Sequence, residues 1–224
     1  MDGYQIVRNS TIYSLIVQIL TGIVGAVALF VPLGEKDKIL GDVLSFEMGV
    51  QVVELFFYFW FLFLKDVATI TTTRYFDWVL STPVMLLTMS AYFSYESLKE
   101  KFRNKSIQEF FAEHRRTLYA IFFFNFLMLL AGFLGEIGYV TKLFAFLYGF
   151  VALLLSFGTL YKNFVFGNDF VKAFFAIMAI TWSGYGVAYM FDPVKKNVAY
   201  TILDIFAKNF FGLYLGFNIF RLRS

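Results

Sequence analysis

Residues 198–220 read VAYTILDIFAKNFFGLYLGFNIF, an apolar run that contains one aspartate, Asp204, and one lysine, Lys208. A helix of about 20 residues crosses the hydrocarbon core of a bilayer, so this run is long enough to span it. Asp204 and Lys208 are four positions apart, which places them on one face of a helix, one turn apart. A charge near the bilayer centre costs about 3 kcal/mol or more, so both residues need a partner or a function.

Six further segments have a similar length and composition. The chain is 59% hydrophobic and 22% aromatic but only 16% charged, a balance that soluble domains rarely have. We therefore expect one domain, residues 1–224, folded as an all-α membrane protein with seven transmembrane helices. The six other predicted spans are Thr11–Leu33, Val43–Leu64, Arg74–Glu96, Thr117–Leu134, Tyr139–Tyr161 and Phe170–Phe191.

The composition also excludes several kinds of site. The chain has no cysteine and one histidine, His114, so disulfides, thiol catalysis, and zinc or haem sites lack their residues. It has no glycine-rich phosphate loop, nucleophile elbow or metal-spaced acidic cluster. We expect no enzyme, no metal site and no nucleic-acid partner. The first apolar run is long enough to span, so we expect it to stay in the membrane rather than serve as a signal peptide.

Basic residues are unevenly divided between the two ends of the predicted helices. Twelve lie at the end that includes the C-terminus, namely Lys36, Lys38, Lys99, Lys101, Arg103, Lys105, Arg115, Arg116, Lys162, Lys172, Arg221 and Arg223. Five lie at the other end, namely Arg8, Lys65, Lys142, Lys195 and Lys196. Because cytoplasmic loops are enriched in Lys and Arg, we expect the N-terminus outside and the C-terminus in the cytoplasm. The one long connection, Ser97–Arg116, would then be cytoplasmic.

Other ionisable residues also fall inside the predicted spans. The third span opens with Arg74 and Asp77. One interpretation is a structural network of ion pairs in which Asp204 neutralises Lys208 and Asp77 neutralises Arg74. A second interpretation uses the lysine amine, which can form a Schiff base with an aldehyde cofactor. Once protonated, that buried cation needs carboxylate counterions, and Asp204 and Asp77 would supply them.

Three stretches resemble the microbial rhodopsins. Residues 74–83, RYFDWVLSTP, are similar to helix three of that family, and residues 203–208, LDIFAK, to its retinal-bearing helix seven. Residues 182–185, WSGY, are similar to the aromatic end of the retinal pocket in helix six. The three stretches occur in the family's order on the family's helices. The resemblance implies a seven-helix bundle of the microbial rhodopsin type that carries retinal and responds to light.

The resemblance assigns roles to particular residues. It implies that Lys208 binds all-trans retinal as a Schiff base, with Asp77 as the primary counterion and proton acceptor. Asp204 would be the second counterion, with Arg74 beside both toward the outside. Trp78 and Trp182 would enclose the polyene, with Tyr185 near the Schiff base and Met85 near the ring end. Further positions that match the pocket are Thr82, Asn125, Met128 and Gly132.

Four positions depart from the pattern of outward proton pumps. Such pumps usually have a carboxylic acid eleven residues after the counterion, where this chain has Thr88. Ser81 replaces the usual threonine one turn after the counterion, Gly186 replaces a proline, and Tyr189 replaces a tryptophan. These departures disfavour efficient pumping. Asp77 argues against chloride pumping, which needs a neutral anion site beside the Schiff base.

Polar residues on the second span favour a channel. Glu47, Gln51 and Glu54 lie on one stripe of this helix, and Asn209 directly follows Lys208. Channelrhodopsins have a row of glutamates on helix two and an asparagine after the retinal lysine, and this chain resembles them there. The compact design is also similar to that of short rhodopsins from giant viruses. We therefore expect Glu54 and Asn209, joined by Ser14, to form a hydrogen-bonded gate in a light-gated cation channel, with Glu47 as a further residue of the gate.

Other interpretations stay open. Glu54 could be a single buried acid bonded to a neighbour, and Asn209 an ordinary amide contact between helices. The alternative function is a light-driven outward proton pump with an unusual donor such as Glu54, and a third is a sensory receptor. The expected partners are retinal, the lipid bilayer, and cations or protons. A homo-oligomer is compatible with the resemblance, because dimers and pentamers both occur in such families.

Overall fold

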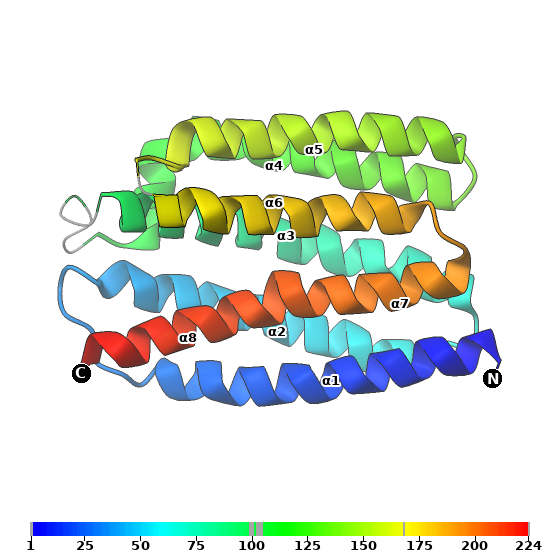
Figure 1. Ribbon diagram of the computed structural model, residues 1–224, viewed down its shortest axis with the longest axis horizontal. Coiled ribbons are helices and arrows are strands. Elements are labelled where there is room, and N and C mark those ends of the chain that lie inside the picture. The colour runs from blue at the N-terminus through cyan, green and yellow to red at the C-terminus, as the bar shows by residue number, and fades with distance from the viewer. Residues whose placement is uncertain (1, 99–100, 102–104, 168, 224) are drawn as a thin grey trace.

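The computed structural model describes residues 2–98, 101, 105–167 and 169–223, and this part of the chain is helical without strands. The helices run lengthwise in one bundle, with the two chain ends at opposite ends of it (Figure 1). The first six spans are α1 (Gly3–Ala28), α2 (Lys38–Phe61), α3 (Val67–Ser97), α4 (Ile107–Glu136), α5 (Lys142–Phe164) and α6 (Asp169–Tyr189). The seventh consists of α7 (Pro193–Asp204), η2 (Ile205–Asn209) and α8 (Phe210–Arg223). The predicted seven-helix bundle is confirmed.

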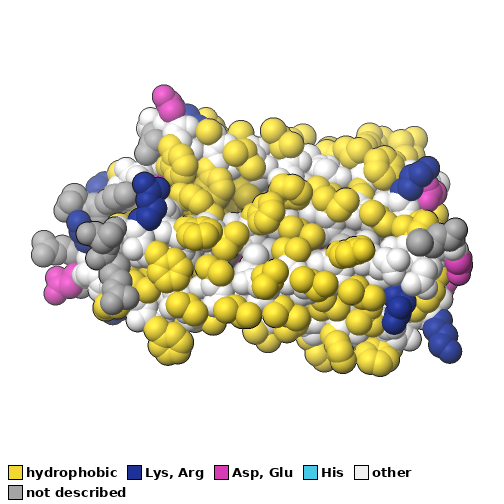
Figure 2. Space-filling view, turned by 60° about the horizontal axis from the view of Figure 1, so that its bottom comes forward, with side chains coloured by type: hydrophobic (Ala, Val, Ile, Leu, Met, Phe, Trp, Pro, Cys, Tyr) yellow, Lys and Arg dark blue, Asp and Glu magenta, His cyan; other side chains and the backbone are white. Residues whose placement is uncertain are grey.

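The outer surface of the bundle suits a membrane. Within the described residues, five helices are long and apolar enough to cross one, namely α1, α4, α5, α6 and the continuous segment Pro193–Leu222. Figure 2 shows hydrophobic side chains along the length of the visible face, with charged side chains gathered at its two ends. Large apolar side chains such as Phe30, Tyr139 and Ile180 are exposed. Exposed apolar surface on this scale is stable only against lipid, so the chain is an integral membrane protein.

The expected connection Ser97–Arg116 is wrong at both ends. Ser97 still belongs to α3, and α4 begins at Ile107. The early start follows from a capping box, in which the Ser106 hydroxyl accepts from the backbone N–H of Glu109 and the Glu109 carboxylate accepts from the N–H of Ser106. Lys105 pairs with Glu113 at 2.5 Å and supports the same turns. Two basic residues used in predicting the orientation, Lys99 and Arg103, lie outside the described residues.

Aspartates begin two of the helices at the end of the bundle that includes the N-terminus. Asp66 accepts from the backbone N–H of Thr69 at the start of α3, and Asp192 accepts from that of Lys195 at the start of α7. These hydrogen bonds lower the pKa of each carboxyl group. Both carboxylates therefore stay ionised at neutral pH and satisfy N–H groups at the helix N-termini.

The seventh span contains one wide turn. Residues Ile205–Asn209 form a π-helical turn between α7 and α8, with no break in the helix. Lys208 and Asn209 both belong to it, and both are buried. Single π-turns inside α-helices are frequent at functional sites. This turn places the two residues that the sequence singled out against the interior of the bundle.

Candidate functional site

An elongated, mostly apolar cavity lies between α3, α4, α5, α6 and the seventh span, and Lys208 is part of its wall. Most of the residues that the resemblance assigned to a pocket line it: Trp78, Thr82, Met85, Met128, Gly132, Trp182 and Tyr185. The structure thus brings together residues from α3, α4 and α6 around Lys208 of the seventh span. Phe146, Phe150 and Tyr200 line the cavity as well, although no motif in the sequence marked them.

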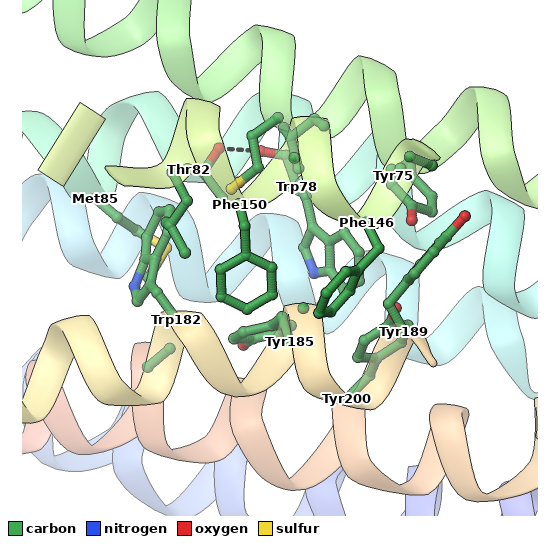
Figure 3. A pocket seen from close by; sticks show the side chains of 18 of the residues that line it. Tyr75, Trp78, Thr82, Met85, Phe146, Phe150, Trp182, Tyr185, Tyr189 and Tyr200 are labelled. Atoms are coloured by element: carbon green, nitrogen blue, oxygen red, sulfur yellow. Dashed lines mark hydrogen bonds between the residues drawn. The ribbon is translucent and has the colours of Figure 1, made fainter. Parts of the chain in front are cut away.

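Two tryptophans bound the cavity at different levels along the bundle. Met85 and Trp182 lie toward one end in Figure 3, and Tyr75, Tyr189 and Tyr200 toward the other, with Trp78 between them. The Gly132 position has no room for a side chain, because an added Cβ would lie 2.7 Å from the Tyr75 hydroxyl oxygen. A long space with apolar and aromatic walls and an amine within it fits a flat, conjugated aldehyde such as retinal.

Two carboxylates face the Lys208 amine. Asp77 Oδ2 lies 2.7 Å from Lys208 Nζ, and Asp204 Oδ1 lies 3.9 Å from it. All three side chains are at most 1% exposed. A cation at this nitrogen is therefore paired in a site shielded from bulk solvent, where its attraction to both carboxylates is strong.

Asp204 is held by four donors. Its Oδ2 accepts from the Tyr58 hydroxyl at 2.6 Å and from Arg74 at 3.1 Å. Its Oδ1 accepts from the Tyr185 hydroxyl at 2.7 Å and from the Trp78 indole N–H at 3.4 Å. Hydrogen bonds of this kind stabilise the ionised form of a carboxylate. The four bonds hold the Asp204 carboxylate in place from three other helices.

Arg74 is fully buried and has a partner for every nitrogen. Its Nε donates to Asn197 Oδ1 at 3.1 Å, and its two terminal nitrogens reach Tyr58, Asp204 and Thr201. No motif in the sequence marked Tyr58, Asn197 or Thr201. Tyr58 lies four residues after Glu54, on the same face of α2, and that spacing was a usable signal.

The expected hydrogen bond between Glu54 and Asn209 is present. Asn209 Nδ2 donates to Glu54 Oε2 at 3.0 Å, and both residues are completely buried. Ser14 is buried too, but the bond described for its hydroxyl is with Gln18 Nε2, at 3.1 Å, and not with this pair. The expectation that Ser14 joins the pair is wrong for this structure, because the remaining oxygens of the pair, Glu54 Oε1 and Asn209 Oδ1, have no hydrogen-bond partner among the described residues.

Glu47 lies at a different level of the same stripe. Its carboxylate accepts a hydrogen bond from the hydroxyl of Thr88 on α3, and it is fully buried. Thr88 stands at the position where outward proton pumps usually have a carboxylic acid that donates a proton. The structure therefore has a carboxylic acid in direct contact with that position, supplied by α2 instead of α3.

Positions that depart from the usual pattern surround the cavity. Gly186 lies against the Phe150 ring, and Tyr189 lines the cavity next to Gly135. The Ser81 hydroxyl bonds the backbone carbonyl of Asp77, at 2.9 Å. Asn125 lies behind the wall and donates to the Thr82 hydroxyl at 2.7 Å.

A lysine amine in an apolar cavity beside two carboxylates can hold a covalently bound aldehyde as a stable cation.

Comparisons with known proteins agree with this geometry. A search of curated proteins found no match. Viral rhodopsin OLPVRII has a similar structure, with a TM-score of 0.82 and 26% identity over 94% of this chain and 95% of that one. The blue light-absorbing proteorhodopsin from Med12 has a TM-score of 0.72 and 15% identity, over 96% of this chain and 97% of that one. Bromide-bound halorhodopsin from Halobacterium salinarum has a TM-score of 0.74 and 13% identity, over 99% of this chain and 98% of that one. The family model for bacteriorhodopsin-like proteins matches residues 9–222, so this chain belongs to that family, the microbial rhodopsins.

Proposed function

We propose that this protein is a light-gated cation channel that carries all-trans retinal on Lys208. Retinal supplies light absorption and the change of shape that follows it. Asp77 and Asp204 hold the positive charge at the Lys208 nitrogen, and Arg74 balances the second carboxylate. The two indoles, of Trp78 and Trp182, orient the chromophore and exclude water from it.

The hydrogen bond between Glu54 and Asn209 carries the channel proposal. Asn209 follows Lys208 within the same π-turn, so a displacement of Lys208 is transmitted to it through one peptide unit. The bond joins α2 to the seventh span at the residue that follows Lys208. Breaking it would separate the two helices there, which supports its role as a gate.

Polar side chains extend from this bond along α2. Glu47, Gln51 and Glu54 are all buried. Burying polar and carboxyl side chains inside a membrane protein is costly, so such residues usually have a function. Three buried polar residues on one stripe of a helix are typical of an ion path. Carboxylates along that path favour cations over anions by charge.

Replacing Glu54 by glutamine tests the gate. We expect Glu54→Gln to change the size or ion selectivity of the photocurrent several-fold while the visible absorption maximum stays nearly constant, because Lys208 bonds Asp77 rather than Glu54. The measurement is photocurrent against voltage in cells, normalised to bound retinal. Wild-type current should be passive and inward at negative voltage, and should reverse near an ion's equilibrium potential.

The matched control is Glu136→Gln, because Glu136 is a carboxylate that pairs with Lys196 away from this stripe. The control should leave selectivity unchanged. Wild-type current that stays outward at every accessible voltage would contradict the channel and support a pump.

The contact between Glu47 and Thr88 favours an outward proton pump as the second candidate. Glu47 is a buried acid on the side of Glu54 that we assign to the cytoplasm, beside the position where pumps have their donor. A pump would therefore depend on Glu47 more than on Glu54. In that case Glu47→Gln should slow recovery of the dark state at least tenfold, and Glu54→Gln should have the smaller effect.

We propose that the N-terminus lies outside and the C-terminus in the cytoplasm. The protein has no cysteine, so an introduced one gives a unique label. Ala112 in the first turns of α4 and Lys195 near the start of α7 are exposed at opposite ends of the bundle. An impermeant thiol reagent added to intact cells should label Lys195→Cys and leave Ala112→Cys unlabelled. The reverse pattern would invert the topology.

A further inference from the structure

Gln51 is the buried residue on the polar stripe whose side chain has no protein partner. It lies on α2 between Glu47 and Glu54 and is 4% exposed. Neither its amide nitrogen nor its amide oxygen has a hydrogen-bond partner among the described residues. A buried polar group without a partner costs about 1–3 kcal/mol. An uncharged amide that meets no protein group therefore requires another partner, and water is the smallest one.

Glycines on two neighbouring helices make room for this amide. A Cβ added at Gly212 on α8 would coincide with the space of Gln51 Nε2. A Cβ added at Gly22 on α1 would lie 3.5 Å from Gln51 Oε1. The carboxamide therefore extends from α2 into the contact region of α1 and α8, with its polar atoms against glycine backbones. Three helices therefore approach one another closely at this amide.

Other buried polar atoms without a partner among the described residues lie on α1, α2 and the π-turn, which pack against one another. They are Gln18 Oε1 on α1, Glu47 Oε2 and Glu54 Oε1 on α2, and Asn209 Oδ1 in the π-turn. All four are oxygen atoms of residues that are at most 3% exposed. Buried polar atoms without a protein partner are typically bonded to water. Carbonyl and carboxylate oxygens are also the atoms that hydrated alkali cations prefer.

We propose that the Gln51 carboxamide is a second constriction of the ion path, a water-binding amide that cations pass between Glu54 and Glu47. This inference rests on the proposed channel function. Gln51 lies about one helical turn from each glutamate, so water bound at the amide can bridge both levels. The amide replaces part of the hydration shell of a passing cation without binding it as tightly as a carboxylate would. The Glu54–Asn209 bond gates the path, and Gln51 sets how fast ions pass through it.

Gln51→Leu tests the inference, because leucine keeps most of the volume and removes both polar atoms. We expect the photocurrent per bound retinal to fall about tenfold, the effect of a polar partner worth about 1.4 kcal/mol. The visible absorption maximum and the reversal potential should stay near those of the wild type. In light-minus-dark infrared spectra recorded in heavy water, the variant should lose a band of weakly bonded water that the wild type has.

Two glycine variants supply a matched pair. Gly212→Ala places a methyl group where Gln51 Nε2 lies and should reduce the current in the same way. Gly216→Ala, about one turn further along α8, brings its methyl group to 3.5 Å from Ala28 Cβ, an ordinary contact, and should stay within twofold of the wild type. The double variant of Gln51→Leu with Gly212→Ala should lose no more current than Gln51→Leu alone, because both act on one group.

The outcomes separate the two proposals. Passive wild-type current with an unchanged current and an unchanged water band in Gln51→Leu would overturn the role of Gln51 and leave the channel standing. Equal losses in Gly212→Ala and Gly216→Ala would also overturn it, since the effect would then belong to helix packing. Outward wild-type current at every voltage would overturn the channel and, with it, the constriction.

Discussion

Replacing Lys208 by alanine is expected to abolish the visible absorption band of the protein mixed with all-trans retinal. Lys208 supplies the only amine among the residues that line the described cavity, and its Nζ lies 2.7 Å from Asp77. Without that amine no covalent linkage forms, and free retinal absorbs in the near ultraviolet. The loss should be complete, which makes this the largest effect that we expect.

Absorption spectra of purified protein, before and after hydroxylamine, measure this effect. Wild-type protein should show a visible band that hydroxylamine bleaches. Lys195→Ala is the matched control, because Lys195 lies in the first turn of the same span with a side chain that is 78% exposed. A visible band that persists in Lys208→Ala without an added amine would move the attachment site to another residue.

Asp77→Asn should have the second-largest effect. Asp77 is the carboxylate nearer to the Lys208 nitrogen, at 2.7 Å against 3.9 Å for Asp204. Removing its charge leaves the cation on the linkage nitrogen with a weaker partner. At acidic pH the visible band should shift to longer wavelength. As the pH rises, the nitrogen should lose its proton about 2 pH units earlier than in the wild type, giving a near-ultraviolet form.

A spectroscopic pH titration of both variants, Asp77→Asn and Asp204→Asn, measures this difference. Asp204 is tied to four donors, so its substitution should also reduce stability and the yield of coloured protein. Asp77 lacks that network, and Asp77→Asn should keep the yield while it changes the titration. An unchanged spectrum and titration in Asp77→Asn would assign the main counterion role to Asp204.

Much of the fold and of the cavity could be predicted from the sequence. The seven spans follow from apolar length, since a bilayer requires about 20 residues for each crossing. Lys208, Asp77 and Asp204 could be selected because ionisable residues inside such spans are rare. The sequence identified the tryptophans of the cavity through the motifs around them, since composition alone would not separate Trp78 and Trp182 from other buried aromatic residues.

Contacts between distant parts of the chain could not be predicted in this way. The hydroxyl of Thr88 bonds Glu47 from 41 positions away, and Arg74 bonds Asn197 from 123 positions away. A helix pattern specifies which face a residue occupies but not which residue of another helix lies at the same depth. Ser14 illustrates the limit: its burial fits the prediction, but its bonding partner is its own neighbour Gln18.

The π-turn at Ile205–Asn209 contains one residue more than an ordinary α-helical turn would. If it tightened to ordinary α-helical bonding, one residue would have to be absorbed, which corresponds to about 100° of rotation and about 1.5 Å of rise. Helix α8, which follows the π-turn, would then rotate about its axis and shift along it relative to α7. That rotation would carry Asn209 away from Glu54 and Gly212 away from Gln51 at the same moment. One reversible change of pitch beside the lysine could thus move two separated points of the helix without stretching a covalent bond.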